Sequence, residues 1–247
     1  MMNPHADAEY ADSNWHSLYK IGGAAALLMV AITLAQFVVF IVAPPPLEGT
    51  ATDWFALFQK SAVSGLLGFE SLLVIYALLS ILVSVALFAA LRPVSQSLTA
   101  LFLVLSVIGG MAFVVARPAL EMLSLSNQYS AATTDAQRAA ILAAGETMVA
   151  LFHGTAFQVS YILGSITGLL IAAVMLRSNV FSRTTAYLRI GSSVFDFGIF
   201  IPGIGLFISL LSVVFLLVFN ILIARRLFQL GSSVWKEKAT MRLLENR

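Results

Sequence analysis

The chain contains no cysteine and few charged residues. Only 11% of its 247 residues are Asp, Glu, Lys or Arg, 60% are hydrophobic, and the mean hydropathy is +0.94. The absence of cysteine excludes a disulfide framework, a thiolate metal site and thiol chemistry. Soluble domains carry about 25% charged and about 45–50% apolar residues. Because a water-soluble fold could not cover this much apolar surface, the composition predicts an all-α, polytopic helical bundle in a membrane.

The sequence motifs of common catalytic and nucleotide-binding sites are also absent. There is no HExxH, GxSxG, Walker loop or dinucleotide fingerprint. The only histidines are His5, His16 and His153, so a zinc or haem site built on several imidazoles is not expected. The net charge is only +2, and the basic residues are spread between apolar runs, which argues against nucleic acid as a partner. The sequence thus predicts no catalytic or metal-binding residue and leaves the cofactor open.

Six apolar runs are long enough to cross a hydrocarbon core of about 30 Å. They cover about residues 21–43, 66–91, 98–116, 149–176, 185–201 and 206–224. Pro44, Pro93 and Pro118 follow the first three runs, where proline ends a helix. The fifth run is the most polar, because it contains Arg189 and Asp196. We interpret the first run as a retained span, because it is too long for a signal peptide and follows an acidic segment.

Lysine and arginine are distributed unequally between the two sides of the predicted bundle. With six spans, eleven of the fourteen fall on the side of the two termini, and three (Lys60, Arg117 and Arg138) fall on the other side. The excess predicts that both termini are cytoplasmic. The predicted organisation is an N-terminal tail (1–19), a transmembrane domain (20–228) and a basic C-terminal tail (229–247).

The two long connections both lie on the predicted outer side. The first, 44–65, contains TDWFALFQKS, which could form a short interfacial helix. The second, 118–148, contains Thr134 and Gln137 at the spacing of a capping box, which predicts a helix that starts near Asp135 and runs into the fourth span. A ligand or partner site would most easily be built on this side.

Five ionisable residues fall at one depth, in the outer third of the predicted bundle. Glu70 lies about one turn inside the second span, Arg117 ends the third, and Glu146 and His153 bracket the entrance of the fourth. Asp196 lies about five residues, or ~8 Å, from the outer end of the fifth span. Hydrocarbon disfavours such side chains unless they have a partner, a water-filled cavity or a function. We therefore predict that these five residues line an outer, ligand-binding polar pocket.

Helical phase supports a shared interior. Glu146 and His153 are seven residues apart, and their face continues through Ser160 and Thr167. The same face includes Gly164, and GSITG (164–168) places Gly164 and Gly168 at a spacing that allows another helix to approach closely.

A purely structural explanation of the polar residues stays open. Arg117 could form an ion pair with Glu70 or with Asp196 that only pins helices together. Glu146 could be solvated at the membrane surface, and His153 could donate to a backbone carbonyl.

Two segments resemble a known bacterial family. LFAALRPVSQSLTAL (87–101) and FHGTAFQVSYILGSITGLLIAAVMLRSNVFSRTTAYL (152–188) are similar to the membrane family described as domain of unknown function 4386. The similarity extends over about residues 18–230. It implies a multi-helix protein of the bacterial cytoplasmic (inner) membrane and supplies no activity.

Three classes of function follow. We favour a non-enzymatic accessory subunit, sensor or binding protein whose outer pocket binds a ligand, with membrane lipids and other membrane protein subunits as candidate partners. The alternatives are a membrane-embedded enzyme that uses His153 as a base with an acidic partner, and a small-molecule transporter. No inverted repeat or pair of broken mid-membrane helices favours transport.

Overall fold

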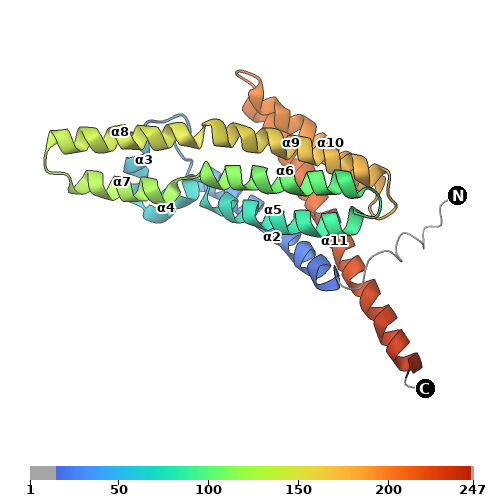
Figure 1. The fold of residues 1–247 in the computed structure, drawn as a ribbon. Helices are drawn as coiled ribbons and strands as arrows, with labels where there is room; N and C mark the ends of the chain where they lie inside the picture. The colour runs from blue at the N-terminus through green and yellow to red at the C-terminus, as the bar shows by residue number, and fades with distance from the viewer. Residues whose placement is uncertain (1–14, 246–247) are drawn as a thin grey trace. The chain divides into compact units, whose positions relative to one another are not determined.

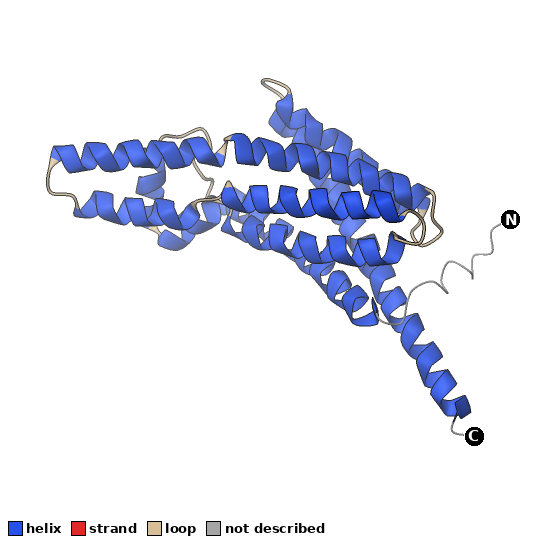
Figure 2. Ribbon diagram, viewed as in Figure 1, coloured by secondary structure: helices blue, strands red, loops and turns tan. Residues whose placement is uncertain are grey.

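The computed structural model describes residues 15–245, and for residue 206 and residues 233–245 it describes the backbone only. Every regular element in this part of the chain is a helix (Figures 1 and 2). The predicted all-α class is therefore confirmed. Most of the predicted N-terminal tail lies outside the described residues.

The chain divides into two compact units, each described separately here. The first contains residues Met1–Val30, Leu78–Gly110 and Tyr161–Arg247, and the second contains Ala31–Ala77 and Met111–Ser160. Four long helices contribute residues to both units: α2 (His16–Val42), α5 (Ser71–Leu91), α6 (Gln96–Val115) and α9 (Thr155–Leu176).

Five helical segments are long and apolar enough to cross a membrane, judged by length and composition within the described residues. They are His16–Val42, Ser71–Leu91, Gln96–Ala131, Asp135–Leu176 and Phe207–Ser232. These segments and the family reported below identify a multi-pass membrane protein. The predicted fifth span corresponds to α10 (Arg183–Asp196) and the 3-10 helix η2 (Phe197–Phe200), which are not among the five. The count of six spans and the orientation of the termini stay predictions.

The second unit contains four shorter helices, which we call the connector bundle: α3 (Ala51–Lys60), α4 (Ala62–Gly68), α7 (Ala119–Ala131) and α8 (Asp135–Phe152). Helix α3 packs against the other three, and α7 and α8 form an antiparallel hairpin (Figure 1). Both helices predicted in the long connections are present. Gln137 donates its N–H to Thr134 Oγ1 at 3.3 Å and accepts from the Thr134 N–H at 3.3 Å, so the predicted capping box starts α8 at Asp135.

Aromatic side chains hold the connector bundle together. Trp54, Phe55 and Phe58 on α3 pack with Phe69 and Phe152, and the buried core also contains Ala51, Ala119 and Met122. The Trp54 and Phe69 rings meet edge to face, with centroids 4.6 Å apart. Such pairs contribute about 0.5–1.5 kcal/mol beyond the buried area. The bundle thus has a packed core of its own.

Two predicted spans contain a break that the hydropathy does not show. The predicted run 66–91 begins inside α4, and the chain turns at Phe69–Glu70 before α5 starts at Ser71. The predicted run 149–176 begins in the last turn of α8, and His153 and Gly154 separate α8 from α9. Helix α8 therefore does not run continuously into the fourth span. Both breaks position residues of the candidate site.

In the first unit, α10 packs along α11 (Gly205–Glu245). The turn between them contains Pro202 and Gly203, and Gly203 has a φ of 81°. Ser182 starts α10 by accepting the Thr185 N–H at 3.2 Å. Helix α11 continues as far as Glu245, into the predicted C-terminal tail.

Candidate functional site

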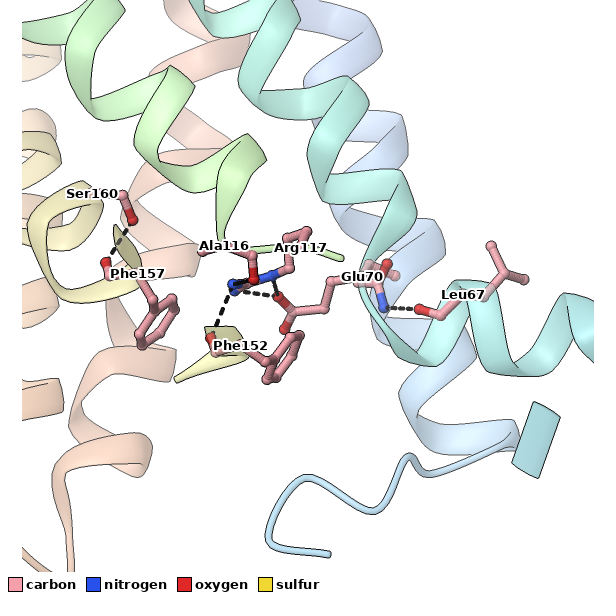
Figure 3. A network of polar contacts seen from close by, with 8 residues as sticks. Leu67, Glu70, Ala116, Arg117, Phe152, Phe157 and Ser160 are labelled. Carbon is pink, nitrogen blue, oxygen red and sulfur yellow. Dashed lines mark hydrogen bonds and ion pairs between the residues drawn. The ribbon is translucent and has the colours of Figure 1, made fainter. Parts of the chain in front are cut away.

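The guanidinium of Arg117 lies at the centre of the polar site in the second unit (Figure 3). We call Arg117 and the groups that it contacts the Arg117 junction. Its Nε and Nη2 contact the same oxygen of Glu70, Oε2, at 2.7 and 2.6 Å. Its Nη1 donates to the carbonyls of Ala116 at 3.1 Å and Phe152 at 3.3 Å. All three nitrogens therefore have an oxygen partner, as a buried charge requires.

Three phenylalanine rings surround the same guanidinium. The Cζ atom of Arg117 lies 4.2 Å from the ring centroid of Phe113, 4.3 Å from that of Phe152 and 4.9 Å from that of Phe157. A guanidinium near an aromatic face gains about 0.5–2 kcal/mol, most where water is excluded. The Arg117 side chain is only 2% exposed, so these rings replace water around most of the charge.

The junction forms where three parts of the chain leave helical geometry. Glu70 lies between α4 and α5 with a φ of 60°, and Arg117 lies between the end of α6 and Pro118. Phe152 is the last residue of α8, where carbonyl groups have no partner within the helix. Arg117 Nη1 satisfies one of these carbonyls. A single side chain therefore ties together the starts or ends of three helices.

The ion pair settles which acid is the partner of Arg117. The sequence left Glu70 and Asp196 open, and the structure pairs Arg117 with Glu70. The expectation that Arg117 has an acidic partner is thereby confirmed. Its role in binding a ligand stays a prediction.

His153 lies beside the junction, at the break between α8 and α9. Its ring meets the Phe152 ring edge to face at 4.8 Å and that of Phe157 at 6.5 Å. These are two of the three rings that face the Arg117 guanidinium. His153 is exposed, and its backbone carbonyl accepts a hydrogen bond from Gln158 Nε2 at 3.3 Å. An exposed imidazole and a buried guanidinium thus share two aromatic neighbours.

Glu146 has a different role, at the start of α3. Its Oε1 accepts the N–H of Ala51 at 2.9 Å, which is one of the unpaired donors at a helix start. Asp53 lies in the same turn, and its Oδ2 accepts from the N–H and the hydroxyl of Thr50, both at 2.8 Å. The backbone bond and then the hydroxyl bond lower the pKa of Asp53 below its usual 3.8. Glu146 therefore connects α8 to α3.

Asp196 belongs to the first unit, whereas the other four predicted site residues belong to the second. Its Oδ1 accepts a short hydrogen bond from the hydroxyl of Ser212 on α11. On the same face of α10, Arg189 Nη2 donates to the carbonyl of Gly164 at 3.0 Å. A Cβ at Gly168 would overlap Ser193 Oγ, so one glycine of the GSITG segment does allow the close approach that its spacing predicts.

The family model described as Domain of unknown function (DUF4386) matches residues 21–235. The chain belongs to the DUF4386 family. This match confirms the resemblance found in the sequence, and it covers every residue in the site contacts described above. No curated protein and no solved structure matches this DUF4386 protein.

Several contributors to the junction were not predicted from the sequence. The sequence assigns no role to Phe113, Phe152 or Phe157, and the backbone carbonyl of Phe152 carries no sequence signal. One hint exists: Phe113 precedes Arg117 by four residues, the distance between neighbours on a helix face. Phe152 and Phe157 flank His153–Gly154, and glycine in a long apolar run is a common break signal.

Proposed function

We propose that this DUF4386 protein is a six-span protein of the bacterial inner membrane that binds a ligand or a partner subunit on its outer side and catalyses no reaction. In this proposal both termini are cytoplasmic and the connector bundle faces outward. The observation that carries the proposal is the Arg117 junction. It holds a buried charge where three helices start or end, directly behind the exposed ring of His153.

The length of α10 with η2 supports the sixth span. Its 14 α-helical and 4 3-10-helical residues extend about 29 Å at 1.5 and 2.0 Å per residue, close to the thickness of a hydrocarbon core. At the other end of this hairpin, Arg226 Nε on α11 donates to the carbonyl of Val180. Arg226 therefore lies level with the start of α10, on the side that the lysine and arginine distribution places in the cytoplasm.

The contacts of the acids support binding more than catalysis. A membrane-embedded enzyme would use Glu70 or Asp196 to orient His153 as a general base. Glu70 Oε2 instead contacts Arg117, and Asp196 Oδ1 accepts from Ser212. Both acids thus have other partners, and the geometry favours a protein that holds charge in place over one that transfers a proton.

Native mass spectrometry of gently solubilised protein tests this proposal. We expect the wild type to carry a bound small molecule, lipid or protein subunit, and His153→Ala to lose it while remaining folded. His5→Ala, which removes an imidazole from the predicted N-terminal tail, serves as the control and should retain it. If wild type and His153→Ala carry the same species in the same amount, or if no species is bound and no added anion stabilises the protein, the outer binding site does not exist as proposed.

A further inference from the structure

Arg117 and Glu70 form a close ion pair, but not in the strongest arrangement available to these groups. The strongest fork places one carboxylate oxygen on each of two guanidinium nitrogens. Here Nε and Nη2 converge on one oxygen, Oε2 (Figure 3). A carboxylate or phosphate group that approached without constraint could instead present two oxygens to the same two nitrogens. Arg117 could therefore bind such a group at least as well as it binds Glu70.

The backbone of Glu70 is the second observation. Glu70 has a φ of 60°, and it is the one non-glycine residue among 15–245 with a positive φ. Side chains other than glycine, asparagine and aspartate rarely adopt this conformation, and its energetic cost must be met by other contacts. Release of Glu70 from Arg117 would let this link between α4 and α5 relax. The strain therefore weakens the hold of Glu70 on the guanidinium.

The two partners also differ in exposure. The side chain of Glu70 is 14% exposed, whereas that of Arg117 is 2% exposed. Besides Glu70, Arg117 contacts three aromatic rings and the carbonyls of Ala116 and Phe152. Glu70 is thus the more accessible and more strained member of the pair, and Arg117 is the fixed one.

We propose that Glu70 occupies the binding site of an anionic ligand, and that a carboxylate or phosphate group displaces Glu70 and binds Arg117 in its place. The group belongs to a lipid headgroup or to a small molecule in solution. This inference rests on the proposed function and names its ligand class. Displacement of Glu70 would free the turn between α4 and α5, so ligand binding would alter the packing of the connector bundle.

The test uses Glu70→Gln, which removes the competing charge and leaves a side chain of the same size. Thermal unfolding in detergent is followed against increasing inorganic phosphate in one series and against short-chain, soluble phosphatidate in another. We expect at least one probe to stabilise Glu70→Gln at a concentration at least tenfold lower than the wild type needs. The double variant Glu70→Gln/Arg117→Gln should lose this response, and Glu48→Gln, which changes an exposed acid, should behave as the wild type.

Each outcome of this experiment decides the inference. A response to both probes identifies the phosphate group as the ligand, a response to inorganic phosphate alone identifies a small anion in solution, and a response to phosphatidate alone identifies a lipid headgroup. An equal response of the single and double variants, or no response of Glu70→Gln, overturns the proposal. If Glu70→Gln does not fold, Glu70→Gly replaces it, because glycine adopts a φ of 60° freely. If neither variant folds even with the probes present, Arg117 requires Glu70 itself and the proposal is wrong.

Failure here is distinguishable from failure of the proposed function. A bound species that is lost in His153→Ala, together with no anion response in Glu70→Gln, would leave the outer binding site in place and exclude Arg117 as its anion partner. An anion response in the absence of any co-purified species would support the Arg117 site and show that its ligand dissociates during purification.

Discussion

Replacement of Arg117 by alanine measures how strongly the junction holds the second unit together. The change removes a guanidinium that is 2% exposed and leaves Glu70, 14% exposed, without its ion-pair partner. It also removes the donor to the Phe152 carbonyl and the charge among three aromatic rings. Loss of one member of a buried pair typically costs about 3–5 kcal/mol.

The expected shift can be expressed as a melting temperature. For a chain of this size, 1 kcal/mol corresponds to about 2–4 °C, so Arg117→Ala should lower the melting temperature by roughly 6–20 °C. Arg138→Ala is the matched control, because Arg138 is exposed and donates to the exposed carbonyl of Ala132 at 3.3 Å. An exposed interaction of this kind contributes about 0–1 kcal/mol.

The assay is thermal unfolding of purified protein in one detergent, with both variants measured beside the wild type. The sequence has three tryptophans, and Trp54 lies in the core beside Phe69 and Phe152, so its fluorescence reports on this unit. Trp15→Phe and Trp235→Phe would leave Trp54 as the sole tryptophan. Equal shifts for Arg117→Ala and Arg138→Ala would refute the buried ion pair.

Substitutions at four positions test further features of the structure. Glu70→Gly should be more stable than Glu70→Ala by about 1–2 kcal/mol in thermal unfolding, because both lose the carboxylate and only glycine adopts a positive φ without strain. Equal stability of the two variants would mean that the turn at residue 70 is unstrained. Gly145→Ala should destabilise by about 1–3 kcal/mol, because its Cβ would lie 2.7 Å from Phe55 Cζ and 2.8 Å from Ala51 Cβ. Gly164→Ala, whose Cβ would meet no atom within 4 Å, should be neutral or stabilising by up to about 1 kcal/mol. A larger loss of stability in Gly164→Ala than in Gly145→Ala would contradict the packing of α3 on α8. The lowered pKa of Asp53 means that the folded state favours the ionised carboxylate. Its contribution to folding stability is fully present above the usual pKa of 3.8 and is lost as the pH falls through the lower folded value. The difference in melting temperature between the wild type and Asp53→Ala should therefore be smaller at pH 3 than at pH 7.

The membrane helices were predictable because their cause is local. Long apolar runs indicate where a helix can lie in hydrocarbon, and a proline after the run indicates where it ends. Helix α2 ends at Val42, just before Pro44, and α6 ends at Val115, just before Pro118. The start of α8 was predictable for the same reason, since Thr134 and Gln137 form their capping contacts within one turn.

The two breaks were not predictable because their causes are distant in the chain. The turn at Glu70 is held by Arg117, 47 residues further along. The break after Phe152 is accompanied by a bond from Arg117 to the Phe152 carbonyl, over 35 residues. Hydropathy reads both segments as continuous apolar runs, so it places residues 66–91 and 149–176 in single spans.

The candidate site was predictable as a set of residues but not as a set of pairs. Depth along a helix follows from residue position, which brought Glu70, Arg117 and His153 to one level. Which acid meets Arg117 depends on which helices are neighbours, and Glu70 and Asp196 lie at similar predicted depths. Helical phase could not separate them, because it describes one helix at a time.

Accessibility of single cysteines in intact cells tests most directly whether the connector bundle faces outward from a six-span membrane domain. The chain has no cysteine of its own, so each introduced thiol is the sole target. Gln128 on α7 and Asn179 between α9 and α10 are both exposed. We predict that a membrane-impermeant maleimide labels Gln128→Cys in intact cells and labels Asn179→Cys only after permeabilisation. Labelling of Asn179→Cys in intact cells, or protection of Gln128→Cys until permeabilisation, would contradict the account.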